Sequence, residues 1–147
     1  MKNLWWILLI VVIALGWWWF ASTGSTTDTV MDENIAEVSD ISYIDISPVD
    51  VKDLIDTTDD LVILDMSNAY AAGHIPGAIN YYVGDGLVDA AIKNGDLDSS
   101  KPYLVYCHTD SASISGAKKL IEAEFSPVYR LEGNYSAWSD AGYDIEK

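Results

Sequence analysis

The chain contains very few cysteines and histidines, the side chains that bind most transition metals and, for cysteine, form covalent cross-links. Its 147 residues include one cysteine, Cys107, and two histidines, His74 and His108. A single cysteine forms no disulfide within the chain, so the fold depends on no such bridge. One cysteine and two well-separated histidines also make no ligand cluster, and we therefore expect neither a metal nor another cofactor.

Basic residues are scarce as well. Eight Lys and Arg stand against 23 Asp and Glu, which gives a formal net charge of −15 at pH 7. All the acidic residues follow residue 21. A charge of this sign repels phosphate backbones and anionic lipid surfaces, so we expect no nucleic-acid partner.

The N-terminus carries the one long uncharged run, the 18 residues 4–21. As a helix it would extend about 27 Å, close to the thickness of a bilayer's hydrocarbon core. Tryptophans stand at both ends of the run, as at the two membrane interfaces. With Lys2 as the nearby positive side chain, residues 1–21 are predicted to be a single-pass transmembrane anchor. The C-terminal domain would then face outside the cytoplasm, on the periplasmic or extracellular side.

A cleaved signal peptide is the alternative for this segment. Residues 21–24 are small and could form a cleavage site. The run is long for a signal peptide, and bulky aromatics precede the candidate cut, which favours an uncleaved anchor. Residues 22–40, rich in Ser, Thr, Asp and Glu, are predicted to be a flexible acidic linker.

Residues 41–147 alternate between strand-like and helix-like patterns. This alternation predicts an α/β domain with a mostly parallel central sheet and helices on both faces. Ser47 is the expected cap of the first helix, with Pro48 at its first position, and Gly73 is expected to end a short helix in a left-handed conformation. The expected strands are 43–46, 61–64, 78–82, 102–106 and 127–131. The first expected helix starts at 48 and has an apolar stripe of Val51, Leu54 and Ile55, and the others are 68–72, 87–93, 113–124 and 135–141.

Cys107 follows one of these strands and precedes a helix. The first N–H groups of a helix lack internal partners and carry partial positive charge. A sulfur held at that end is drawn toward the thiolate, its reactive form. A buried cysteine with only a packing role is the alternative.

Two further segments favour a reactive Cys107 over a cysteine with only a packing role. Residues 73–78 read Gly-His-Ile-Pro-Gly-Ala, and residues 131–138 read Leu-Glu-Gly-Asn-Tyr-Ser-Ala-Trp. Together with the strand end at Asp65 and with Tyr106-Cys107, they resemble the rhodanese-like sulfurtransferase family. The resemblance implies a sulfurtransferase that carries sulfane sulfur as a persulfide on Cys107. A small donor such as thiosulfate would supply the sulfur, and a thiol or a cyanide-like acceptor would remove it.

The same resemblance assigns the substrate-binding loop to His108, Thr109, Asp110, Ser111 and Ala112, whose N–H groups would surround the transferred sulfur. From Cys107 to Ala112 the loop has six residues, the length of the sulfurtransferases. Related phosphatases use a longer loop that ends in Arg. No Arg or Lys lies between Lys101 and Lys118, which argues against a phosphatase.

The loop also departs from the family pattern. Asp110 stands where Gly is common, and Ala112 where Arg is common. The carboxylate is expected to oppose a thiolate and to repel thiosulfate, while His108 would either pair with Asp110 or point to solvent. Asp65 and His74 are expected to be structural. These departures leave a second interpretation, a catalytically weak rhodanese-like module that binds a partner or senses oxidants through its one thiol.

Overall fold

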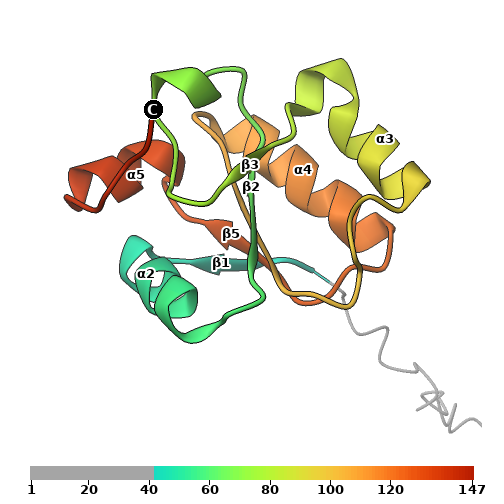
Figure 1. Cartoon of the computed structure of the whole chain (residues 1–147), viewed down its shortest axis with the longest axis horizontal. Coiled ribbons are helices and arrows are strands. Elements are labelled where there is room, and N and C mark those ends of the chain that lie inside the picture. Colours follow the sequence, from blue (N-terminus) through green and yellow to red (C-terminus); the bar gives the residue numbers. More distant parts are fainter. Residues whose placement is uncertain (1–41) are drawn as a thin grey trace, which may run out of the picture. The chain divides into compact units, whose positions relative to one another are not determined.

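The computed structural model describes residues 42–147 (Figure 1). The predicted anchor at 1–21 and linker at 22–40 lie outside the described residues. Within residues 42–147, no helix combines the length and the apolar character needed to cross a membrane.

A five-stranded parallel sheet forms the centre of the described domain, as the sequence predicts. The strand order is β1-β5-β4-β2-β3, and every pair of neighbours is parallel. Strand β4, which precedes Cys107, lies between β5 and β2 in the middle of the sheet. The strands are β1 (Ile44–Ile46), β2 (Val62–Asp65), β3 (Ile79–Asn80), β4 (Tyr103–Tyr106) and β5 (Val128–Leu131).

Four helices of the described region cover the two faces of this sheet (Figure 1). Helices α3 and α4 pack on one face, and α2 and α5 on the other, each pair over its own buried hydrophobic cluster. The helices are α2 (Pro48–Thr57), α3 (Leu87–Asn94), α4 (Asp110–Glu122) and α5 (Asn134–Asp140), and the short 3₁₀ turns are η1 (Tyr70–Ala72) and η2 (Val83–Asp85).

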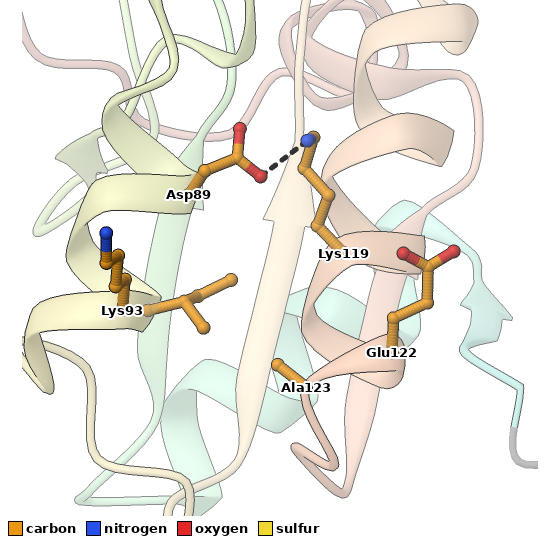
Figure 2. Close-up of a pocket in the computed structure, with 6 residues that line it drawn as sticks. Asp89, Lys93, Lys119, Glu122 and Ala123 are labelled. Atoms are coloured by element: carbon orange, nitrogen blue, oxygen red, sulfur yellow. Dashed lines mark hydrogen bonds and ion pairs between the residues drawn. The ribbon is translucent and has the colours of Figure 1, made fainter.

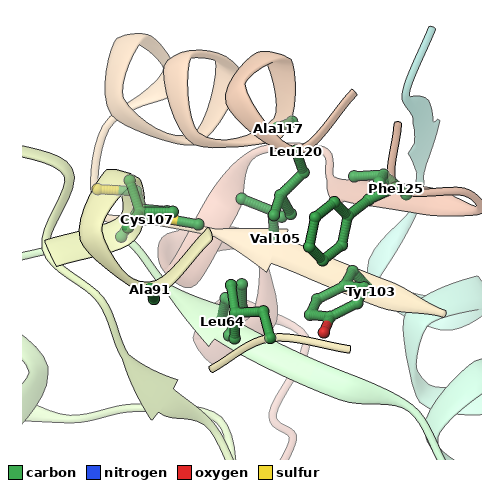
Figure 3. Packing of buried hydrophobic residues seen from close by; sticks show 12 residues of the cluster. Leu64, Ala91, Tyr103, Val105, Cys107, Ala117, Leu120 and Phe125 are labelled. Atoms are coloured by element: carbon green, nitrogen blue, oxygen red, sulfur yellow. The ribbon is translucent and has the colours of Figure 1, made fainter. Parts of the chain in front are cut away.

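The alternation of side chains along β4 decides which face Cys107 joins. Side chains of a strand point to opposite faces in turn. Leu104 and Tyr106 accordingly pack in the cluster beneath α2 and α5. Val105 and Cys107 pack beneath α3 and α4 (Figure 3). Figure 3 shows Cys107 at one end of this cluster, away from Phe125 at the other.

Local signals set several helix ends. The Ser47 hydroxyl accepts the Asp50 N–H at 3.3 Å, and Pro48 is the first helical residue, so the predicted cap is confirmed. Gly73 does not have the predicted left-handed cap conformation; its φ is 158°. A Cβ at this position would lie 2.2 Å from the Tyr135 hydroxyl oxygen. The glycine is therefore needed for close packing against that side chain.

Most predicted ranges differ from the structure by one to three residues at one end or both, and the helix expected at 68–72 is the 3₁₀ turn Tyr70–Ala72. The helix expected at 113–124 spans Asp110–Glu122, and the one expected at 135–141 spans Asn134–Asp140. The strand expected at 78–82 is reduced to Ile79–Asn80. Helix α4 begins earlier because its first carboxylate, that of Asp110, has partners on other elements and suits the positive helix N-terminus.

The raised pKa values of two buried tyrosines on β4, Tyr103 and Tyr106, lead us to expect a loss of stability at alkaline pH. Burial raises the pKa of Tyr106 above its usual range, and the charge of Asp65 raises it further. Burial also raises the pKa of Tyr103. A raised folded-state pKa favours the neutral form in the folded protein. The resulting stability is therefore full below about pH 10, the tyrosine pKa in the unfolded chain, and is lost as the pH rises further.

We expect the free energy of unfolding to fall with pH above about 10, by up to about 1.4 kcal/mol per pH unit for each such tyrosine. The Tyr106→Phe variant should show a shallower fall than the wild type. Urea unfolding between pH 9 and 11 measures both slopes. Equal slopes would contradict the role given to Tyr106.

Candidate active site

Cys107 lies directly after the central strand and is almost fully buried, with 3% of its surface exposed. Among the described residues, its Sγ has one polar contact, the Thr109 hydroxyl at 3.8 Å. Met66 packs in the same cluster. The position beyond the carboxyl end of a central parallel strand is where open α/β sheets bind ligands.

The start of α5 holds the backbone of Cys107 from both sides. The Cys107 N–H donates to Asn134 Oδ1 at 3.1 Å. The Cys107 carbonyl accepts the Tyr135 N–H at 2.9 Å. Asn134 is 4% exposed and adopts a left-handed φ of 57°, a conformation that Asn tolerates better than most residues. This geometry fixes the peptide groups on either side of the cysteine.

The loop leaves a series of backbone donors unused. Within residues 42–147, no acceptor meets the N–H groups of five consecutive residues, His108, Thr109, Asp110, Ser111 and Ala112. The last three are the first turn of α4, whose N–H groups have no partner inside the helix. Thr109, Asp110 and Ser111 are exposed, while Ala112 packs against the hydrophobic cluster beneath α4. Such a row of donors is suited to binding an anion.

Arg130 compensates the charge of Asp110, which corrects the expectation from the sequence. Its Nη1 donates to Asp110 Oδ1 at 2.9 Å and its Nε to Asp45 Oδ1 at 2.6 Å. The hydrogen bond to Asp45 raises the pKa of Arg130, as does that to Asp110, while burial lowers it. Asp110 also accepts Asn134 Nδ2 at 2.6 Å. The carboxylate therefore acts as an anchor of the loop, and its charge is shared with a buried cation.

The sequence left two alternatives for His108, a pair with Asp110 or a side chain that points to solvent, and the structure shows neither. Its ring stacks on that of Tyr135, with centroids 4.3 Å apart and an angle of 13° between the planes. Its Nε2 is buried and has no hydrogen-bond partner among the described residues. It therefore neither pairs with Asp110 nor points freely to solvent.

Asp65 and His74 have the structural roles predicted for them. Asp65 is fully buried, and its Oδ1 accepts the Ser67 N–H at 2.7 Å. The His74 ring stacks on Tyr70 at 3.7 Å between centroids, and its Nδ1 lies 3.1 Å from the Tyr70 carbonyl oxygen. Glu146 contacts the other ring nitrogen at 3.5 Å.

No group of three His, Cys, Asp or Glu side chains in the described region is placed to hold a metal ion.

A surface hollow between α3 and α4 is separate from this site (Figure 2). Asp89 and Lys119 face one another across the hollow, and Lys119 Nζ donates to Asp89 Oδ1 at 2.5 Å. The hollow contains neither Cys107 nor any residue of its loop. Its lining residues are Asp89, Ile92, Lys93, Lys119, Glu122 and Ala123.

Arg130, Asn134 and Tyr135 were not predicted as site residues, although Asn134 and Tyr135 lie in the 131–138 segment that carries the family resemblance. Each lies more than 20 positions after Cys107. One sequence signal could have pointed to Arg130, which lies within a predicted strand. A charged side chain in a buried strand needs a partner. A search for nearby acids could have suggested a pair with Asp110.

The chain is similar to known proteins in sequence and in fold. Residues 47–141 match the family model described as a rhodanese-like domain. The thiosulfate sulfurtransferase GlpE of Pseudomonas entomophila is 40% identical over 82 residues, which are 52% of this chain and 69% of that protein. GlpE of Pseudoalteromonas translucida is 32% identical over 87 residues, 56% of this chain and 77% of that protein. The crystal structure of the Alr3790 protein from Anabaena sp. superposes with a TM-score of 0.61 at 28% identity, covering 69% of this chain and 81% of that one.

Proposed function

Because this chain belongs to the rhodanese-like domain family, we propose that it transfers sulfane sulfur by way of a persulfide on Cys107. Its class is that of the rhodanese-type sulfurtransferases. The donor we propose is thiosulfate or a similar small sulfur compound, and the acceptor is a thiol or a cyanide-like nucleophile.

The observation that carries this proposal is the row of unpaired N–H groups after Cys107. The Cys107 thiolate attacks the outer sulfur of thiosulfate, the S–S bond of the donor breaks, and sulfite leaves with the bonding electrons. The product is Cys–S–S⁻, whose outer sulfur carries negative charge next to donors that no other group in the described region uses. An acceptor nucleophile then takes that sulfur and returns Cys107 to the thiolate.

Intact-mass spectrometry tests the proposal directly. We expect the purified domain, after exposure to thiosulfate, to gain the mass of one sulfur atom on Cys107. Addition of cyanide should remove that mass and release thiocyanate. A cysteine that reacts with iodoacetamide but gains no sulfur from any of several donors would overturn the proposal.

The burial of Cys107 bears on the second candidate function, a catalytically weak binding or redox-sensing module, only through weak catalysis, because a redox-sensing thiol must also be accessible to its oxidant. A thiol with 3% of its surface exposed is less accessible to large substrates. Such a module would show oxidation of Cys107 by peroxide but no multiple turnover with thiosulfate and cyanide. Steady-state turnover of the wild-type protein separates the two functions.

We also propose that residues 4–21 anchor the protein in a membrane, with the domain outside the cytoplasm. The support is the sequence: an uncharged run of 18 residues with tryptophans at both ends. We expect the full chain to remain with membranes after a carbonate wash and to retain its N-terminal residues by intact mass. A soluble product that begins near Ser22 would contradict the anchor and indicate a cleaved signal peptide.

A further inference from the structure

Asn134 connects two groups of the catalytic loop that are not bonded to each other. Its Oδ1 accepts the Cys107 N–H, and its Nδ2 donates to Asp110 Oδ1. An N–H requires an oxygen acceptor, and a carboxylate requires a donor, so these partners fix the orientation of the amide. The bond from Cys107 to Asn134 is buried, whereas the bond from Asn134 to Asp110 is partly buried, because the Asp110 side chain is 69% exposed.

The two hydrogen bonds of Asn134 form a bridge from the Cys107 N–H to the Asp110 carboxylate, and Arg130 holds the Asp110 end of this bridge. The same Asp110 Oδ1 that accepts from Asn134 also accepts from Arg130 Nη1. Arg130 is in turn bonded to Asp45 on β1 and lies within 3.4 Å of the Ser113 hydroxyl on α4. The position of the Asn134 amide is therefore set by the sheet and by the N-terminus of α4.

We propose that Asn134 is a positioning residue that sets the place of Cys107 relative to the donors of the loop. The bridge occupies the Cys107 N–H, so the available donors begin at His108. A charged acceptor on Nδ2 also polarises the amide and strengthens the bond from Cys107 to Oδ1. The inference rests on the proposed function for its effect on sulfur transfer, but the positioning itself is measurable without sulfur transfer.

Two single variants at Asn134 separate the side chain from the backbone. Asn134→Gly removes the amide and keeps the left-handed φ without strain. Asn134→Asp keeps an acceptor for Cys107 but places a second carboxylate beside Asp110. We expect kcat for thiosulfate to fall about tenfold in the glycine variant and about 100-fold in the aspartate variant, with KM changed less than about threefold, since a small misplacement of a reacting group has effects of this size.

The reciprocal double variant Asn134→Asp with Asp110→Asn is the decisive one. The amide introduced at position 110 would donate its N–H to the carboxylate introduced at position 134 and offer its carbonyl oxygen to Arg130. Each partner of the bridge then keeps a hydrogen bond, with two atoms of the new amide in place of the single Asp110 Oδ1. We expect kcat within about threefold of wild type, because the geometry that sets the reaction rate is restored. Asn94→Gly, an exposed asparagine at the end of α3, is the matched control and should leave kcat unchanged.

The rate of Cys107 alkylation by iodoacetamide is measured on every variant alongside circular dichroism. It should fall in the folded single variants and recover in the double variant. If Asn134→Gly is folded and alkylates and turns over like wild type, or if the double variant stays as slow as Asn134→Asp, the inference is wrong. A wild type that takes up no sulfur contradicts the proposed function alone, because the alkylation series still decides the bridge.

Discussion

Replacement of Cys107 by Ser is expected to abolish sulfur transfer and leave the fold intact. A serine hydroxyl cannot form the S–S bond of the persulfide, so no residual turnover above the uncatalysed rate is expected. The side chains have nearly the same size, so packing beneath α4 is preserved. The buried hydroxyl costs about 1–3 kcal/mol of stability unless it finds a partner.

The measurement is thiosulfate–cyanide turnover, with circular dichroism to verify folding. Ser99→Ala is a suitable control, because Ser99 is an exposed residue of the turn before β4, outside the proposed site, and its side chain has no hydrogen bond in the described region. Its turnover should match wild type. Transfer activity retained by a folded Cys107→Ser protein would exclude the persulfide mechanism.

The second large effect is expected on stability, from the charge network around Arg130. Arg130 is 7% exposed, whereas the side chains of Asp45 and Asp110 are 45% and 69% exposed. Removal of both carboxylates leaves a cation buried without a counter-charge, which costs about 3–5 kcal/mol. Removal of the cation leaves two carboxylates that water can reach, and its cost is about 1–2 kcal/mol.

We therefore expect Asp45→Ala with Asp110→Ala to be clearly less stable than Arg130→Met in urea unfolding. The triple variant that combines all three changes should be more stable than the double alanine variant, because the unpaired charge is gone. If Arg130→Met costs as much as the double alanine variant, the burial of the guanidinium is not the source of the stability.

The sequence by itself determined the α/β class, the parallel sheet and the placement of Cys107 at a strand end. These features follow from patterns that are local in the chain. A continuous apolar run such as 61–64 predicts a buried parallel strand, and Ser47 before Pro48 predicts a helix start. Because ligand sites in such sheets lie beyond the carboxyl ends of strands, the position of the cysteine also followed.

Only the tertiary structure decided the electrostatics of the loop. In the sequence, the Asp110 carboxylate lies three residues after the nucleophile Cys107. From that position alone, it was predicted to oppose the thiolate and to repel thiosulfate. The fold brings Arg130 from β5 and Asn134 from α5 to the same oxygen atom. These partners lie 20 and 24 positions away, and their approach depends on β5 pairing with β4.

Contacts between residues distant in the sequence also account for the early start of α4 and for the orientation of the His108 ring. A helix boundary near 110 depends on which partners hold its first carboxylate, and these come from other elements. The His108 ring is oriented by Tyr135, which reaches it only because the start of α5 is bonded to the Cys107 carbonyl. Hydrophobic periodicity reports which face of an element is buried. It does not report which polar groups meet there, since hydrogen bonds and ion pairs require distances that only the packed chain defines.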